Sequence, residues 1–150
     1  MKIAEALVLR ADLQKRVESL RTRIVKNTVI QQGDKPAEDP KLLLKQASQA
    51  ISQLKDLMFA INAANYGGKT AQGRTLTEAI AERDALMLKH SFVKATAESV
   101  VKPAAYGTRE IRWVATISAA DLQKEADELA IKIRDVNLEI QEANWQIEIS

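Results

Sequence analysis

The sequence contains no cysteine, a single histidine and few glycine, proline or aromatic residues. The absence of cysteine excludes disulfides, thiolate metal sites and cysteine nucleophiles, and one histidine excludes a histidine-rich metal site. Aromatic residues make up 4% of the chain, alongside five glycines and three prolines, which is poor material for a β-sandwich or barrel. No apolar run reaches the roughly 18 residues of a membrane span, and we find no export signal, so we expect a cytoplasmic protein.

The chain does contain enough apolar material for one compact core. Its 150 residues are 46% hydrophobic and 28% charged with a net charge of +2, and they predict a single domain over 1–150. The charge is uneven, since residues 1–30 carry seven basic and three acidic side chains and residues 118–150 carry three and eight. We interpret this asymmetry as first and last helices that lie near each other, in one subunit or in neighbouring subunits.

Apolar residues at alternating steps of three and four predict four long helices. We expect them at 3–27, from Pro40 to about 65, from a cap at Thr75 or Thr77 to about 101, and from Ser118 through 143. The third helix is apolar on two sides, and its second stripe contains Ala81, Ala85, Leu88, Phe92 and Ala95. A helix with two apolar sides is covered on both, which favours a partner subunit.

Two alternating segments, 110–117 and 145–149, predict short β-strands. The fold class is therefore mainly α, with four long helices in antiparallel hairpins, bundle-like or coiled-coil-like, and these short β segments. Because the last helix separates the two strands by roughly 37 Å, they cannot pair within one chain. We expect the tail strand to hold subunits together, with four candidate contacts: Trp113, Trp145, Ile147 and Ile149.

Charged residues near the third helix are the candidates for a polar site. The cluster consists of Arg74, Glu78, Glu82, Arg83, Asp84 and His90. Glu78 and Glu82 are four residues apart and share a helix face, where carboxylates bind a divalent cation or form ion pairs. The one histidine cannot complete a ferritin-like dimetal site, which needs a Glu-x-x-His motif on each of two helices. We expect neither a metal nor another cofactor, and no residue is assigned a catalytic role.

Several stretches resemble a family of uncharacterised bacterial proteins, some of which are labelled septicolysin. They are EALVLRADLQKR at 5–16, QQGDKPAEDP at 31–40, GRTLTEAIAERD at 73–84, the segment from Tyr106 to Ile111, LQKEAD at 122–127 and IQEANW at 140–145. The resemblance covers nearly the whole chain and implies a small, soluble, helical protein without an established activity. The label septicolysin implies a cytolysin-like membrane activity.

Together these observations predict a homo-oligomeric structural or interaction protein whose partner is itself. In this reading Arg10, Asn65, Arg83 and His90 set the helix register or line a cavity between subunits. Three alternatives remain: an enzyme or a small-ligand or cation-binding protein with a polar site between subunits, a nucleic-acid-binding protein, and a cytolysin. The nucleic-acid alternative depends on the basic side chains of the first helix, which are Arg10, Lys15, Arg16, Arg21, Arg23 and Lys26. We expect neither nucleic acid nor a membrane as partner.

Overall fold

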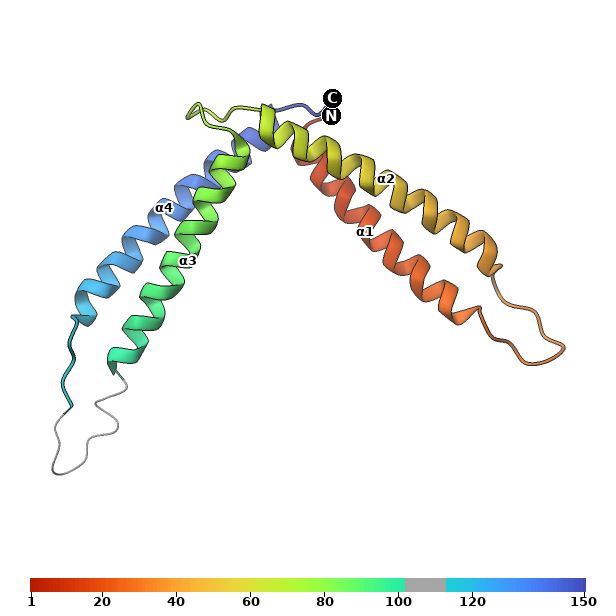
Figure 1. The fold of residues 1–150 in the computed structure, drawn as a ribbon, viewed down its shortest axis with the longest axis horizontal. Coiled ribbons are helices and arrows are strands. Elements are labelled where there is room, and N and C mark those ends of the chain that lie inside the picture. The colour runs from red at the N-terminus through yellow and green to blue at the C-terminus, as the bar shows by residue number, and fades with distance from the viewer. Residues whose placement is uncertain (102–112) are drawn as a thin grey trace. The chain divides into compact units, whose positions relative to one another are not determined.

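The computed structural model describes residues 1–101 and 113–150, and it contains four helices. They are α1 (Ile3–Lys26), α2 (Pro40–Gly67), α3 (Leu76–Val101) and α4 (Ala119–Gln146). Helices α1 and α2 form one antiparallel hairpin, the first hairpin, and α3 and α4 form another, the second hairpin (Figure 1). The predicted fold class of four long helices in antiparallel hairpins is confirmed.

The contacts of the chain group into two compact units. One unit contains residues 1–68 and 144–150, and the other contains residues 69–143. Each unit is built around one hairpin, and the tail that follows α4 belongs to the first unit. The single domain expected from length and composition stays a prediction.

The helix ends follow local capping chemistry. Asp39 precedes Pro40 and accepts a hydrogen bond from the Lys41 amide at 2.9 Å, as expected for an N-cap. Thr75 is the cap of α3, because its hydroxyl accepts from the Glu78 amide at 3.1 Å while the Glu78 carboxylate accepts from the Thr75 amide at 2.6 Å. The alternative cap, Thr77, lies inside α3 and is wrong.

Each hairpin buries one apolar face of each helix against the other helix. In the first hairpin the core contains Leu20, Leu43 and Ala50, and in the second it contains Val93, Leu122, Ala126 and Leu129. The predicted apolar seam of α4 is confirmed, since all its members from Leu122 to Ala143 are buried except Ile133, which is half-buried. At about 25 cal/mol per Å² of buried apolar area, these faces are the main stabilising contribution to each hairpin.

The two predicted β-strands are wrong in the residues that the structure describes. Residues 113–117 form no strand, and 110–112 lie outside the described residues. The other segment is mostly helical or irregular, because α4 continues through Gln146 and only Glu148 forms a β-bridge. Alternating polarity in so short a segment does not outweigh the continuing helical hydrogen bonds.

The tail after α4 pairs with the N-terminus of its own chain, not with another subunit. The bridge joins Lys2 to Glu148, with hydrogen bonds from the Ile3 amide to the Ile147 carbonyl at 3.0 Å and from the Ile149 amide to the Met1 carbonyl at 2.9 Å (Figure 1). A salt bridge of 2.9 Å between Lys2 and Glu148 supports it. The expectation that the tail cannot pair within one chain was wrong, because it considered only 110–117 as a partner strand and not residues 1–3.

The two hairpins are built as copies of one pattern. Helices α2 and α4 are both 28 residues long and begin and end 79 residues apart, while α1 and α3 begin 73 residues apart. We call residues related by these offsets equivalent. Equivalent caps make equivalent bonds: the Lys2 amide donates to Glu5 at 2.7 Å, as the Thr75 amide does to Glu78.

The segments that follow α2 and α4 are equivalent as well. Lys69, two residues after α2, bridges to Thr75, just as Glu148, two residues after α4, bridges to Lys2. The Thr70 amide donates to the Arg74 carbonyl at 2.8 Å, which matches the bond from Ile149 to Met1. Each tail therefore pairs with the residues just before the other hairpin's first helix. The tail of α2 pairs with the start of α3, and the tail of α4 pairs with the start of α1.

The amino-acid sequence carries the same repeat. The segment IAEALVLR at 3–10 corresponds to LTEAIAER at 76–83, and INAANY at 61–66 corresponds to IQEANW at 140–145. Core residues exchange size between the copies, since Leu20 is equivalent to Val93 and Ala50 to Leu129. The exchanged residues are apolar in both copies, so each hairpin keeps a hydrophobic core although its packing differs.

Candidate functional site

The six residues of the predicted polar cluster divide among separate interactions. Glu78 caps α3 through Thr75, and Arg83 binds its neighbour Asp84 at 2.8 and 3.0 Å. Arg74 binds Glu139 of α4, Glu82 is exposed, and His90 lines a groove. The structure therefore does not place these six side chains around one site, and no group of three or more His, Asp or Glu within the described residues is placed to hold a metal ion.

Arg74 and Glu139 form a bidentate ion pair in the second unit. The guanidinium donates two hydrogen bonds to the carboxylate, at 3.0 and 2.6 Å, and the Thr70 hydroxyl donates a third at 2.6 Å. Thr70 and Glu139 are buried, and Arg74 is 31% exposed. The contact ties the segment between α2 and α3 to the side of α4, so its geometry indicates a structural clamp.

The electrostatics of this clamp fit that role. Hydrogen bonds from Arg74 and then Thr70 lower the pKa of the Glu139 carboxyl, although burial opposes the shift, and the same pair raises the pKa of Arg74. A carboxylate held ionised by two donors is a poor proton acceptor at neutral pH. The clamp therefore has the properties of a stabilising pair and not of a general base.

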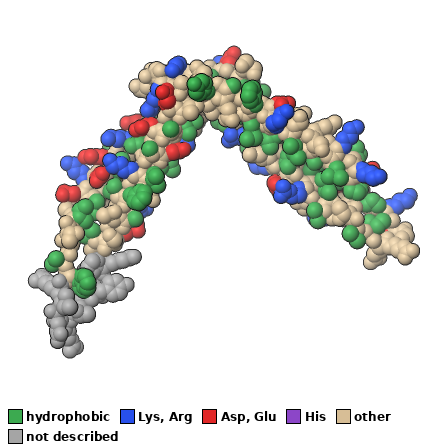
Figure 2. Space-filling view, viewed as in Figure 1, with side chains coloured by type: hydrophobic (Ala, Val, Ile, Leu, Met, Phe, Trp, Pro, Cys, Tyr) green, Lys and Arg blue, Asp and Glu red, His purple; other side chains and the backbone are tan. Residues whose placement is uncertain are grey.

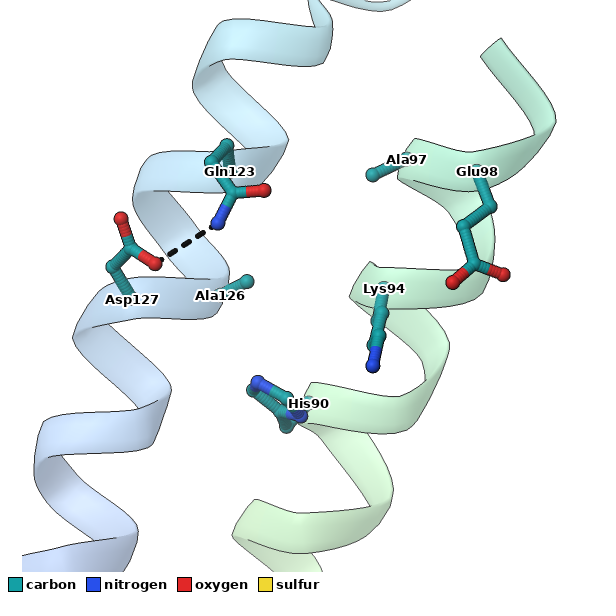
Figure 3. Close-up of a pocket in the computed structure, with 7 residues that line it drawn as sticks. All are labelled: His90, Lys94, Ala97, Glu98, Gln123, Ala126 and Asp127. Carbon is teal, nitrogen blue, oxygen red and sulfur yellow. Dashed lines mark hydrogen bonds between the residues drawn. The ribbon is translucent and has the colours of Figure 1, made fainter. Parts of the chain in front are cut away.

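The predicted residue His90 lies in a groove between α3 and α4 of about 440 Å³. His90, Lys94 and Glu98 come from α3, and Gln123 and Asp127 come from α4 (Figure 3). His90 projects from α3 towards α4, and the Gln123 side chain donates a hydrogen bond to Asp127 at 2.9 Å (Figure 3). Five of the seven residues that line this groove are polar or charged.

The first hairpin has a groove of about 260 Å³ at the equivalent place. It is lined by Val17, Arg21, Ile24, Val25, Leu44, Ala47 and Ile51. These positions are equivalent to His90, Lys94, Ala97, Glu98, Gln123, Ala126 and Ala130 of the second hairpin. One groove position is basic in both copies, but the rest of the lining is apolar in the first hairpin and mainly polar in the second. The grooves thus mark where the two copies have diverged.

Large apolar side chains are exposed on all four helices, and on α2 and α3 they form lines along the helix. On α2 they follow a seven-residue step, with Leu44 54%, Ile51 52% and Met58 44% exposed. On α3 the predicted second stripe is uncovered, with Leu88 61% and Phe92 67% exposed. Figure 2 shows hydrophobic side chains reaching the surface along both hairpins. Exposed apolar lines of this length are typical of surfaces that bind another molecule.

The predicted oligomer contacts lie in two different environments. Trp113 and Trp145 are 61% and 62% exposed and stay available to a partner. Ile147 and Ile149 are half-buried, and their backbones bond to Ile3 and Met1 of the same chain. The Ile147 side chain also lies over Gly68, so both isoleucines take part in a contact within the chain.

The helices of the two hairpins carry opposite charge. Helices α1 and α2 contain nine basic and four acidic residues, a net charge of +5. Helices α3 and α4 contain six basic and eleven acidic residues, a net charge of −5. Lys2, just before α1, forms an ion pair with Glu148, just after α4, and the expected proximity of the first and last helices otherwise stays a prediction.

Part of the basic set on α1 is engaged within the first hairpin. Arg23 binds Glu38 through both carboxylate oxygens, and Arg21 lies 3.8 Å from Glu18. The Nε of Arg10 is buried and has no partner within the described residues. This leaves Lys15, Arg16 and Lys26 as exposed basic side chains on this helix.

The sequence reasoning missed Glu139, Thr70 and the paired grooves. Glu139 lies on an α4 face that is otherwise apolar, and its equivalent in α2 is Ala60. The signal that could have revealed all three is the internal repeat, because aligning the two halves shows where one copy departs from the other.

Comparison with known proteins gives a consistent result. Residues 10–149 match the family described as "Family of unknown function (DUF6847)". A crystal structure of a functionally unknown conserved protein from Corynebacterium diphtheriae is similar over 100% of this chain and 99% of that chain, with 33% identity and a TM-score of 0.89. No curated protein matches.

Neither matching description mentions a cytolysin, so the septicolysin label has no counterpart in these matches. No helix among the described residues is long and apolar enough to cross a membrane. The family match spans most of the chain, and the similar structure has the same arrangement of helices. The chain therefore belongs to the DUF6847 family, whose function is unknown.

Proposed function

We propose that this protein is a structural or interaction protein that works as an assembly of identical copies. The observation that carries the proposal is the line of exposed apolar residues on α2, formed by Leu44, Ile51 and Met58. Complete burial of such a side chain from water contributes about 1.5–3 kcal/mol, and about half of each of these three is still exposed. A surface of this kind is retained where another molecule covers it.

The absence of a convergent polar site agrees with this function. The charged residues near the third helix form a cap, a neighbouring ion pair and a structural clamp. Each is already satisfied by its partner, so none is poised for catalysis. In the groove around His90, the unengaged side chains of His90, Lys94 and Glu98 lie close together.

The mass of the protein in solution tests the proposal. Light scattering after size exclusion at micromolar concentration is expected to give a mass at least twice that of the 16.6 kDa chain. Ile51→Asp is expected to shift the mass towards the monomer, because it buries a charge in the covered surface. Its matched control is Ala130→Asp at the equivalent position of α4, which is expected to leave the mass unchanged. A wild-type protein that stays monomeric throughout this range overturns the proposal.

A second candidate function is binding of a small polar ligand in the groove of the second hairpin. It is favoured by the side chains of His90, Lys94 and Glu98, which make no hydrogen bond or ion pair within the described residues. The two signs of charge suit a small zwitterion. Addition of lysine or glutamate at millimolar concentration is expected to shift the His90 ring signals in NMR spectra, and unchanged spectra with both probes remove this candidate.

A further inference from the structure

We infer that the partner surface for the groove of the first hairpin is the α3 face of the second hairpin in another copy. This inference rests on the proposed function and specifies the contact. Each copy offers its first hairpin to its partner's second hairpin, and receives the same contact in return. The product is a two-fold dimer with two identical interfaces, which closes without leaving either surface exposed.

The shapes of the two surfaces are complementary. The groove is walled by Ile24 and Val25 of α1 on one side and by Leu44 and Ile51 of α2 on the other. The α3 face presents Leu88 and Phe92 among small residues, namely Ala81, Ala85 and Ala95, all exposed. Leu88 and Phe92 lie about 6 Å apart along α3, and Leu44 and Ile51 lie about 10.5 Å apart along α2. The first pair therefore fits between the second pair, as knobs fit into holes in a coiled coil.

The internal repeat shows that each hairpin carries only one of these two surfaces. Leu44 and Ile51 of the groove are equivalent to Gln123 and Ala130, so the second hairpin lacks the apolar groove. Leu88 and Phe92 are equivalent to Lys15 and Ser19, so the first hairpin lacks the apolar stripe. A contact between like hairpins would therefore set groove against groove or stripe against stripe. Only a contact between unlike hairpins joins the groove to the stripe.

Charge selects the same pairing. The helices of two first hairpins bring +5 against +5, and those of two second hairpins bring −5 against −5. Like charges across an interface cost binding energy and slow association, whereas +5 against −5 favours both affinity and encounter. The two hairpins of opposite charge thus recognise each other between copies, in the register that the apolar surfaces define.

Engineered disulfides test the contact directly, because the natural chain has no cysteine. Under oxidising conditions, a mixture of the single variants Ile51→Cys and Phe92→Cys is expected to form a covalent dimer that contains one chain of each. Either variant alone is expected to form at least tenfold less covalent dimer. The matched control is the mixture of Ala130→Cys and Ser19→Cys at the equivalent positions, which is expected to stay uncrosslinked.

The outcomes separate this inference from the proposed function. A monomeric wild-type protein overturns both. An oligomer whose disulfides form between two copies of Ile51→Cys, or two of Phe92→Cys, overturns only the inference. A monomer with an internal disulfide in the double variant Ile51→Cys/Phe92→Cys also overturns it, because the two surfaces then meet within one chain.

The salt dependence of the wild-type mass gives a test that needs no variant. Between 50 mM and 500 mM sodium chloride, the dissociation constant is expected to rise about tenfold, because screening weakens the attraction between oppositely charged hairpins. Contacts between like hairpins predict the opposite, since screening relieves repulsion. A dissociation constant that falls with added salt therefore overturns the inference, even if every cysteine variant fails to fold.

Discussion

The two hairpins share a pattern of caps, tails and core packing, yet they use their surfaces differently. Helix starts, N-caps and the β-bridges of the tails occur at equivalent positions in both. The grooves differ, since one is apolar and the other contains His90, Lys94 and Asp127. The comparison teaches that the contacts that define the hairpin are retained in both copies, while the exposed positions have been free to specialise.

One buried position departs from this rule. In the second hairpin Glu139 binds Arg74 and Thr70, whereas the equivalent residues of the first are Ala60, Met1 and Ile149. The equivalent positions thus hold a charged clamp in one copy and apolar residues in the other. Because a buried ion pair pays a desolvation cost, the two solutions can give similar stability.

The largest expected effect comes from removing the carboxylate of this clamp. Glu139→Ala leaves the buried Thr70 hydroxyl without its acceptor and the partly buried Arg74 without its counter-ion. We expect the free energy of unfolding, measured by urea denaturation, to fall by about 2–3 kcal/mol, less than for a fully buried pair because Arg74 reaches solvent.

Replacing the clamp residues with their equivalents from the first hairpin tests whether the two sites are interchangeable. The triple variant Thr70→Ile/Arg74→Met/Glu139→Ala carries the equivalent residues of the first hairpin and is expected to regain at least half of the loss. A triple variant less stable than Glu139→Ala alone would show that the two sites are not interchangeable, which breaks the comparison at this position.

The next largest loss of stability is expected at Gly68, which contacts Ile147. Ile147 is also the equivalent of Gly68 in the other tail. A Cβ on Gly68 would lie 2.6 Å from Ile147 Cδ1 and 2.8 Å from the Ala64 carbonyl oxygen. Gly68→Ala is expected to cost about 1–3 kcal/mol of unfolding free energy through overpacking. Gly67→Ala is the matched control, because a Cβ there meets no atom within 4 Å.

A double-mutant cycle identifies the cause of that loss. Gly68→Ala/Ile147→Ala is expected to be more stable than the sum of the two single effects predicts, since the shorter side chain removes both close contacts with Ile147 and leaves the one with the Ala64 carbonyl oxygen. Strict additivity would mean that the Ala64 carbonyl alone causes the strain.

A smaller effect appears as the pH is lowered. The hydrogen bonds of Glu139 lower its pKa in the folded state below the ordinary value of about 4.3, so its contribution is present above that value and is lost as the pH falls through the lowered pKa. Protonation leaves the hydroxyl of Thr70 a partner, so the loss is less than that of Glu139→Ala. Urea titrations at several pH values are expected to show a shallower acid decline in Glu139→Ala than in the wild type. Equal declines would exclude Glu139 as a contributor.

The smallest effect follows from an arginine present in both copies. Arg83 binds Asp84, but its equivalent Arg10 is followed by Ala11 and has a buried Nε without a partner in the described part of the chain. Ala11→Asp is expected to raise the free energy of unfolding by about 0.5 kcal/mol, because the new hydrogen bond outweighs the lower helix propensity of aspartate. Ala11→Asn serves as the uncharged control, and an equal gain in both variants would contradict the ion pair.

The helices could be predicted from the sequence because their signals are local. Asp39 before Pro40, the spacing of Thr75 and Glu78, and the seam from Leu122 to Ala143 each act within a few turns of helix. These signals gave the fold class and most helix ends.

The tail contact and the clamp could not be predicted from local signals. The bridge of Glu148 to Lys2 joins residues far apart in the chain. The burial of Glu139 depends on its hydrogen bond from Thr70, which lies on another segment and has no local signal in the sequence. The alternation at 145–149 suggested a strand because it could not show that helical bonds continue to Gln146. Only the repeat, with IxxANY at 61–66 and IxxANW at 140–145, holds long-range information of this kind in the sequence.

The hydrogen bond from Ile149 to Met1 is equivalent to the one from Thr70 to Arg74. Residues 71–73 connect Thr70 to Arg74, whereas the two ends of the chain are not connected to each other. A short linker from residue 150 to residue 1, with new ends opened between Ala71 and Gly73, would give a circular permutant in which the order of the hairpins is reversed. Every helix, cap and bridge of the parent would be available to that rearranged chain. The order in which the two halves are synthesised is therefore separable from the architecture they build.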